Sequence, residues 1–343
     1  MIARLPLILR INVFAFLFGI AAMAFAVPVA FADVDQWEKD WPRTDFSKNG
    51  VDLDEIFSGG IGRDVIPAID APTIGALSVA RDTHDPREPV IRVTVNGHTR
   101  AYPLSVLIWH EIVNDELGGV PIAVTFCPLC NTAIVFDRRM DDQVLDFGTT
   151  GNLRFSDLVM YDRQTESWWQ QFLGEAIIGE YTGTRLKMLP SRIEAFAKFK
   201  KRFPNGQVLN PDRAFGGYGS NPYVGYDSSR YPFLYKGDLP KDMRATARIV
   251  VVGNEAWTLD VLKKHRKITR GDLVISWEPG QNSALDTRTI AKGKDVGNVI
   301  VQRKTADGLK DEVHDVTFAF VFKAFKPEGV VHKSWPPKSG TGS

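Results

Sequence analysis

The sequence has little cysteine and no excess of charge of either sign, and each lack excludes a class of protein. Only two of the 343 residues are cysteine, so a small domain held by several disulfides is excluded and the core depends on burial of apolar side chains. The 42 Lys and Arg residues nearly balance the 41 Asp and Glu residues, for a formal net charge of +1. Such a balance gives no electrostatic basis for binding nucleic acid.

Long apolar runs are also lacking, except at the N-terminus. Arg4 and Arg10 precede residues 11–32, which carry no charge and end in an A-x-A pattern. This order is typical of a secretory signal peptide, residues 1–32, cleaved after Ala32. An uncleaved membrane anchor is the alternative, because 22 uncharged residues are enough to span a bilayer. We therefore expect an exported, soluble protein, periplasmic or secreted, with no membrane span after cleavage. Its partners are unknown, and a periplasmic protein is one candidate.

The mature chain is predicted to be α+β and mostly β, with sheets and short helices. Turn signals such as Asn96-Gly97 between β-rich runs predict hairpins, and residues 104–111 have helical spacing. Ser191 and Glu194 have the spacing of a capping box, which predicts that a helix begins there. The expected divisions are a polar leader (33–50), a single large or duplicated α+β domain (51–335) with halves 51–213 and 239–335 bridged by a Gly/Tyr/Pro-rich covering loop (214–238), and a flexible tail (336–343).

A weak internal similarity suggests that this domain is a duplication of one β-rich unit. Residues 95–107 resemble residues 252–262, and residues 128–134 resemble residues 279–285. The two pairs occur in the same order along the chain, which is the pattern of a repeat. Chance similarity is the alternative.

The two cysteines form a C-x-x-C motif, Cys127-Pro128-Leu129-Cys130, which suits a metal site, a redox dithiol or a short disulfide. Residues 120–126 and 131–138 are apolar and β-branched, so the motif is predicted to join two strands rather than to open a long helix. A turn between strands directs both sulfurs to one side, which favours a metal. The second copy has Glu278 and Gln281 at these positions, so the chemistry is expected in the N-terminal half.

Two cysteines supply only two metal ligands, and the others have to be His or carboxylate. His110 lies closest to the pair in the sequence, and Glu111, His98 and His84 are secondary candidates. Two thiolates and an imidazole suit copper(I), whereas an added carboxylate or water suits zinc. The sequence therefore predicts a site for copper(I) or zinc.

Two other functions remain open at this point. The same pair could serve a thiol–disulfide oxidoreductase, or Cys127 and Cys130 could form a structural disulfide in a non-catalytic binding module. The sequence identifies no catalytic residue and leaves open whether the protein is an enzyme. Trp109, Trp168 and Trp169 are predicted to form a pocket wall. For Trp168 and Trp169 burial in the core is the alternative, and both are favoured over a substrate platform.

Several specific strings resemble a family of exported bacterial and archaeal proteins known only as domain of unknown function family 3179. The strings are DEI (54–56), IPAID (66–70), RAYPL (100–104), WHEIVND (109–115), TFCPLC (125–130), LVMYDRQT (158–165) and GEA (174–176). The resemblance extends from about Asp54 to beyond Tyr226 and implies no settled activity. Asn131 follows the second cysteine where Gly is usual in a knuckle, and Asn also tolerates the left-handed conformation.

Overall fold

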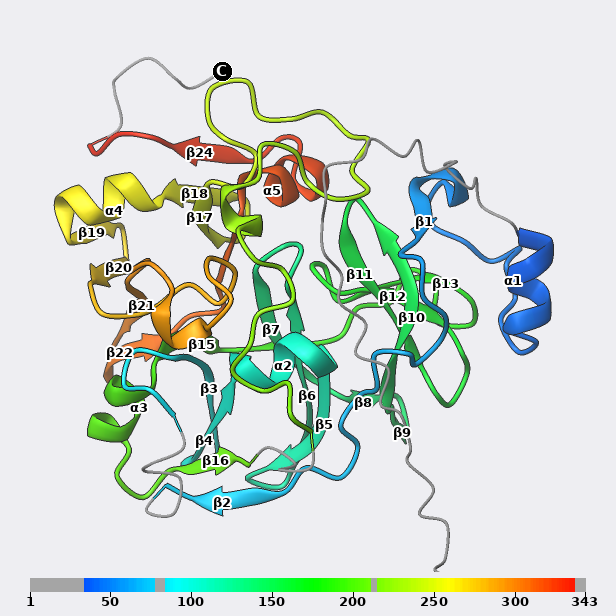
Figure 1. Cartoon of the computed structure of the whole chain (residues 1–343), viewed down its shortest axis with the longest axis horizontal. Helices are drawn as coiled ribbons and strands as arrows, with labels where there is room; N and C mark the ends of the chain where they lie inside the picture. Colours follow the sequence, from blue (N-terminus) through cyan, green and yellow to red (C-terminus); the bar gives the residue numbers. More distant parts are fainter. Residues whose placement is uncertain (1–33, 78–83, 211–214, 337–343) are drawn as a thin grey trace, which may run out of the picture.

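Mainly antiparallel β-sheets linked by short helices make up most of the structure, so the predicted mostly-β fold is confirmed (Figure 1). The computed structural model describes residues 34–77, 84–210 and 215–336, and the predicted signal peptide and most of the predicted tail lie outside these residues. No helix within them is long and apolar enough to cross a membrane. The α-helices are α1 (Val34–Asp40), α2 (Leu104–His110), α3 (Phe196–Arg202), α4 (Leu259–His265) and α5 (Ala319–Phe325), with single 3-10 turns at η1 (Leu53–Glu55), η3 (Tyr226–Ser228) and η4 (Ile290–Lys292).

The N-terminal part of the chain forms three sheets and a small ribbon. The strand orders are β15-β3-β4-β16-β2, β14-β7-β6-β5 and β1-β10-β11-β12-β13, and β8 pairs with β9. The bounds are β1 (Ile56–Ser58), β2 (Ile74–Ala76), β3 (Pro89–Val95), β4 (His98–Pro103), β5 (Ile112–Leu117), β6 (Val120–Cys127), β7 (Thr132–Asp137), β8 (Arg139–Met140), β9 (Gln143–Val144), β10 (Phe147–Arg154), β11 (Asp157–Asp162), β12 (Trp168–Gln170), β13 (Glu175–Ile178), β14 (Met188–Leu189), β15 (Ser191–Ala195) and β16 (Gln207–Leu209).

The C-terminal part forms two four-stranded sheets, with the orders β23-β17-β18-β24 and β19-β20-β21-β22. The bounds are β17 (Arg248–Val252), β18 (Glu255–Thr258), β19 (Lys267–Arg270), β20 (Leu273–Glu278), β21 (Asn298–Thr305), β22 (Gly308–Asp311), β23 (Asp315–Phe318) and β24 (Val330–His332).

The two parts repeat one arrangement of strands and helices. In β15-β3-β4-β16 and in β23-β17-β18-β24, the first three strands are antiparallel and the last is parallel to its neighbour. A seven-residue helix, α2 or α4, follows each central hairpin. Each of these helices ends before a residue of left-handed φ, Glu111 (58°) or Arg266 (61°). The carbonyls of these two residues accept 2.8 Å hydrogen bonds from Phe126 in β6 and Trp277 in β20. These details are consistent with the predicted duplication of a β-rich unit.

Each repeat packs one of its strands against a strand of the other repeat. Strand β15 of the first repeat lies against β21 of the second, and β23 of the second lies against β7 of the first. The amide of Ala195 donates to Asn298 Oδ1 over 2.7 Å, and the amide of Phe318 donates to the Cys130 carbonyl over 3.1 Å. The two repeats are therefore in direct contact, and the C-terminal repeat touches the cysteine turn.

The polar leader is docked on the fold by its aromatic residues. Trp37, Trp41 and Phe46 are buried, and all three rings pack around Trp168 of β12. The described part of the covering loop, residues 215–238, likewise packs several tyrosines against the main core.

The capping box predicted at Ser191 and Glu194 does not begin a helix. Ser191–Ala195 is strand β15, and helix α3 begins at Phe196, the residue that follows this strand. Strand β15 pairs with β3 in a register that places Arg192 opposite Arg92, and Glu194 is buried beside both guanidinium groups. Tertiary pairing of this segment overrides its local helix signal.

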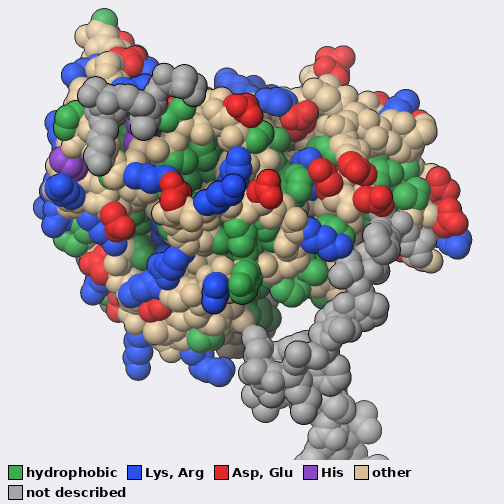
Figure 2. Space-filling model, turned by 90° about the horizontal axis from the view of Figure 1, so that it is seen from above, with side chains coloured by type: hydrophobic (Ala, Val, Ile, Leu, Met, Phe, Trp, Pro, Cys, Tyr) green, Lys and Arg blue, Asp and Glu red, His purple; other side chains and the backbone are tan. Residues whose placement is uncertain are grey.

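The largest hydrophobic cluster contains both cysteines and lies between the N-terminal sheets and the strands that the second repeat contributes. Its fully buried members include Phe126, Phe136 and Trp169. On the face shown in Figure 2, basic and acidic side chains are interspersed, as the near-zero net charge suggests.

Candidate metal centre

The C-P-L-C motif joins β6 and β7 in a tight turn, as its flanking sequences predict. The strands pair antiparallel up to Cys127 and Thr132. The Cys130 amide donates to the Cys127 carbonyl over 3.2 Å and closes the turn. Asn131 has a φ of 54°, the left-handed conformation expected where Gly is usual. The motif therefore does not open a long helix.

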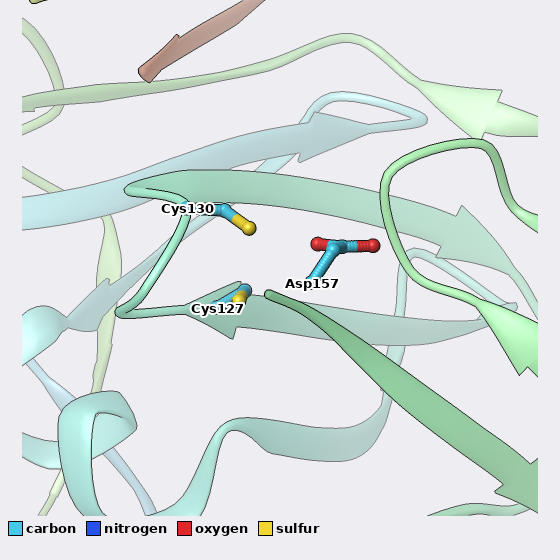
Figure 3. A group of neighbouring side chains, drawn as sticks. All are labelled: Cys127, Cys130 and Asp157. Atoms are coloured by element: carbon cyan, nitrogen blue, oxygen red, sulfur yellow. The ribbon is translucent and has the colours of Figure 1, made fainter. Parts of the chain in front are cut away.

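A carboxylate from another sheet completes the group (Figure 3). Asp157 is the first residue of β11, and its side chain extends toward the two cysteines. The Sγ atoms of Cys127 and Cys130 and a carboxylate oxygen of Asp157 all lie within 4.8 Å of one another. Both cysteines are free thiols, and the exposed fraction is 1% for Cys127 and 0% for Cys130 and Asp157. Two thiols and a carboxylate are thus gathered in the interior.

One oxygen of Asp157 lacks a hydrogen-bond partner. Oδ2 accepts from Gln170 Nε2 (2.5 Å) and from the Phe172 amide (2.9 Å), which fix the carboxylate in place. Oδ1 is buried and accepts no hydrogen bond from an N–H or O–H group among the described residues. Its nearby donors are the two thiols, whose hydrogen bonds lower the pKa of Asp157. Buried polar atoms are nearly always paired, so this oxygen is free to take a further partner. A bound cation would satisfy it.

The backbone around the group is strained. Glu111, Asn131, Phe155 and Ser156 all have φ between 51° and 67°, although none is glycine. Phe155 and Ser156 form the two-residue turn between β10 and β11, where Asn-Gly is the favoured pair. The Ser156 carbonyl faces the thiols and accepts from Cys130 Sγ at 3.4 Å and from Cys127 Sγ at 3.9 Å. Such conformations cost roughly 1–3 kcal/mol each and cluster at functional sites.

Burial controls the protonation of the group. Burial, and then Cys127 and Asp157, raise the pKa of the Cys130 thiol well above its ordinary value. Burial also raises the pKa of Cys127, although a hydrogen bond with Cys130 opposes the shift. Burial raises the pKa of Asp157 to about 6, against hydrogen bonds from Phe172, Gln170 and the two thiols that lower it. Without a cation, the thiols therefore stay protonated at neutral pH, and a metal ion would supply the charge that stabilises thiolates.

The structure does not bring the predicted histidines into this group. Its third member is the carboxylate of Asp157, whereas an imidazole was expected. The nitrogens of His110 lie 2.8 Å from the Pro67 carbonyl and 2.8 Å from the Tyr218 hydroxyl. His98 is exposed at the start of β4. His84 is buried elsewhere, with Nδ1 3.4 Å from Glu88 Oε1.

Glu111, the other secondary candidate, accepts at its carbonyl a hydrogen bond from the amide of Phe126, the residue before Cys127. It is buried, and burial followed by the charge of Asp157 raises its pKa to about 8. Tyr223 of the covering loop packs against the hydrophobic cluster that contains both cysteines. Burial, and then the charges of Glu111 and Cys127, raise its pKa well above the ordinary value.

The three tryptophans that were predicted to form a pocket wall pack in the core or hold a loop. Trp168 and Trp169 are both 0% exposed and pack in two different core clusters. Trp109 is half-buried and donates from Nε1 to the Ser220 carbonyl over 3.2 Å. Trp168 and Trp169 therefore match the core alternative, and Trp109 anchors the covering loop.

Asp157 is the site residue that sequence reasoning missed. Its one signal is a carboxylate at the start of a strand, residues 157–162, in which every residue is buried. No spacing relates this position to the C-x-x-C motif, because the contact is made by two different sheets.

Comparison with known proteins gives a family and no activity. No curated protein and no solved structure matches this chain. The family described as "protein of unknown function (DUF3179)" matches residues 63–329, which include the whole cysteine and aspartate group and both repeats up to, but not including, the last strand, β24. The chain belongs to this family, as the resemblance of its sequence strings implies.

Proposed function

We propose that the protein binds a thiophilic metal ion, Zn²⁺ in the first place, through Cys127, Cys130 and Asp157. The observation that carries this proposal is the buried, unpartnered Oδ1 of Asp157 beside two free thiols within 4.8 Å. Donor atoms of a tetrahedral zinc site stand roughly 3–4 Å apart, given bonds of about 2.0–2.3 Å. A small contraction of the group is enough to reach that geometry.

The ligand types favour zinc over copper(I). Carboxylate oxygen is a poor ligand for copper(I), which prefers thiolate, thioether and imidazole, whereas zinc accepts sulfur and oxygen together. The imidazole that would favour copper(I), His110, is hydrogen-bonded elsewhere. Zinc needs a fourth ligand, for which we propose a water or the carboxylate of Glu111.

The compartment also favours a metal. If residues 1–32 are a signal peptide, the protein works in an oxidising environment, where a close thiol pair forms a disulfide unless a metal or chemistry prevents it.

Sequencing the N-terminus of the protein recovered from the periplasm or medium tests the export proposal. We expect the chain to begin at Asp33, and an intact Met1 in the membrane fraction would contradict cleavage.

Metal analysis of the reduced protein, purified with zinc and with copper(I) in turn, tests the proposal. We expect one zinc per chain, loss of the metal in Cys127→Ser, and affinity weakened by at least about tenfold in Asp157→Asn, which retains the shape but not the charge. His110→Ala is the matched control, and we expect it to retain the metal. Loss of zinc in His110→Ala with retention in Asp157→Asn would reverse the assignment.

A thiol–disulfide oxidoreductase is the second candidate, because Asp157 could act as a proton acceptor for the thiols. In such a reaction a thiol gives its proton to Asp157, and the thiolate attacks a substrate disulfide to form a mixed disulfide. The second thiol then closes the Cys127–Cys130 disulfide and releases the reduced substrate. Burial of both thiols disfavours this reading, since exchange needs an accessible thiolate. Reduction of a model disulfide by the metal-free protein, at a rate lowered in Asp157→Asn, would support it instead.

A further inference from the structure

The cysteine turn is held from outside by the second repeat. The carbonyl of Cys130 accepts two hydrogen bonds from β23, one from the Phe318 amide (3.1 Å) and one from the Thr317 hydroxyl (2.9 Å). Thr317 is fully buried, and its hydroxyl also lies 2.9 Å from that of Thr132, the residue that begins β7. A strand distant in the sequence therefore fixes the peptide group that carries Cys130.

The residues that flank Cys130 are held by the same strand. Asn131 Nδ2 donates to the Val316 carbonyl over 2.6 Å, which secures the left-handed residue after the second cysteine. The Ala133 amide donates to Asp315 Oδ1 over 3.0 Å. Four consecutive residues of β23, Asp315–Phe318, thus each contact the segment from Cys130 to Ala133.

We propose that Thr317 is a positioning residue for the thiol pair, through which the second repeat, itself lacking cysteines, sets the geometry of the site. The expected effect on zinc affinity rests on the proposed metal binding by Cys127, Cys130 and Asp157, whereas the effect on the thiol pair itself does not. The Cys130 peptide determines where its Sγ stands relative to the other two donors. The Thr317 hydroxyl is one of only two described groups that hold the carbonyl of this peptide from the second repeat. Groups that orient metal ligands in this way are worth about 10- to 100-fold in affinity.

The fold offers a matched control in the reciprocal contact. Asn298 of the second repeat accepts a 2.7 Å hydrogen bond from Ala195 of the first, so it also joins the two repeats. The other hydrogen bonds of the Asn298 side chain are donated by Nδ2 to the carbonyls of Glu278 (3.4 Å) and Pro279 (3.2 Å). None of these contacts reaches the cysteine turn. Asn298→Ala should therefore weaken the joint between repeats without moving the thiols.

The test compares wild type with Thr317→Val, Thr317→Ser and Asn298→Ala in the full mature chain. Two quantities are measured: zinc affinity by competition with a chelator, and the equilibrium between dithiol and Cys127–Cys130 disulfide in glutathione buffers. Thr317→Val retains the shape and removes the donor, so we expect zinc binding to weaken about 10- to 100-fold. The disulfide equilibrium should shift toward the oxidised form by about 3- to 10-fold, the effect of one hydrogen bond. Thr317→Ser should restore both values, and Asn298→Ala should change neither.

The two measurements separate this inference from the proposed function. If wild type binds no zinc but Thr317→Val still shifts the disulfide equilibrium, metal binding is refuted and the positioning role stands. If wild type binds zinc and Thr317→Val changes neither quantity, the positioning role is refuted alone. If Asn298→Ala changes zinc affinity and the disulfide equilibrium as much as Thr317→Val does, both effects come from a general loss of stability. That result would also overturn the inference.

Discussion

At the scale of single residues, the identity of the third ligand depends on which polar atoms are already paired. His110 is near the cysteines in the sequence, yet both its nitrogens are engaged by Pro67 and Tyr218. Asp157 comes from another sheet and has a free buried oxygen. The residue types and the C-x-x-C spacing were sufficient to predict a thiol site. Only the packing of two sheets, which no local pattern encodes, identifies the carboxylate.

Trp168 is expected to contribute to stability but not to metal binding, and a substitution tests this. Its side chain is fully buried and packs against Trp37, Trp41 and Phe46. Trp168→Ala leaves a large cavity, and we expect it to lower the free energy of unfolding by about 3–5 kcal/mol in chemical denaturation. The zinc content of the folded fraction should not change. A loss of metal without a loss of stability would show that this tryptophan belongs to the site.

At the scale of elements, local pattern predicted the hairpins and failed for the segment before α3. Strands β6 and β7 follow from β-branched apolar runs on either side of a turn, because both signals act over a few residues. The capping-box pattern at Ser191 is also local, but pairing with β3 and burial of Glu194 draw the segment into a strand. Short helices of seven residues have little stability of their own, so tertiary contacts decide their bounds.

The 3-10 turn η3 of the covering loop is anchored by an ion cluster whose effect depends on pH. Asp227 accepts from Arg248 (2.9 Å), Lys294 (2.7 Å) and Ser283 (2.6 Å). Burial alone raises the pKa of Asp227, but the charge of Arg248 and these hydrogen bonds lower it from 3.8 to about 2. A depressed carboxylate pKa stabilises the fold above the unfolded pKa, and the contribution is lost as the pH falls through the folded pKa.

We therefore expect Asp227→Asn to be less stable than wild type by about 2 kcal/mol at pH 5–8, because the shift corresponds to that free energy. The difference should narrow as the pH falls from about 4 to about 2. Denaturant unfolding of both proteins across this range measures it. A difference that stays constant down to pH 2 would assign the cost to lost packing rather than to the charge.

At the scale of the whole molecule, two β-rich repeats pack strands against each other, and one of the repeats holds the thiols. The similarity of residues 95–107 to 252–262 indicated the repeat, but not that β23 would lie against β7 and β15 against β21. The contacts between the two repeats lead us to expect that they unfold together. We expect a single calorimetric transition in which the van't Hoff and calorimetric enthalpies agree. Two resolved transitions would indicate separate domains and would weaken the positioning role of the second repeat.

The most direct test of the central claim is a crystal structure of the reduced protein grown with zinc, with anomalous diffraction recorded on both sides of the zinc edge. We predict one anomalous peak within about 2.0–2.3 Å of Sγ of Cys127, Sγ of Cys130 and a carboxylate oxygen of Asp157. A peak bound by His110, or reduced thiols at full zinc concentration with no peak between them, would contradict the account.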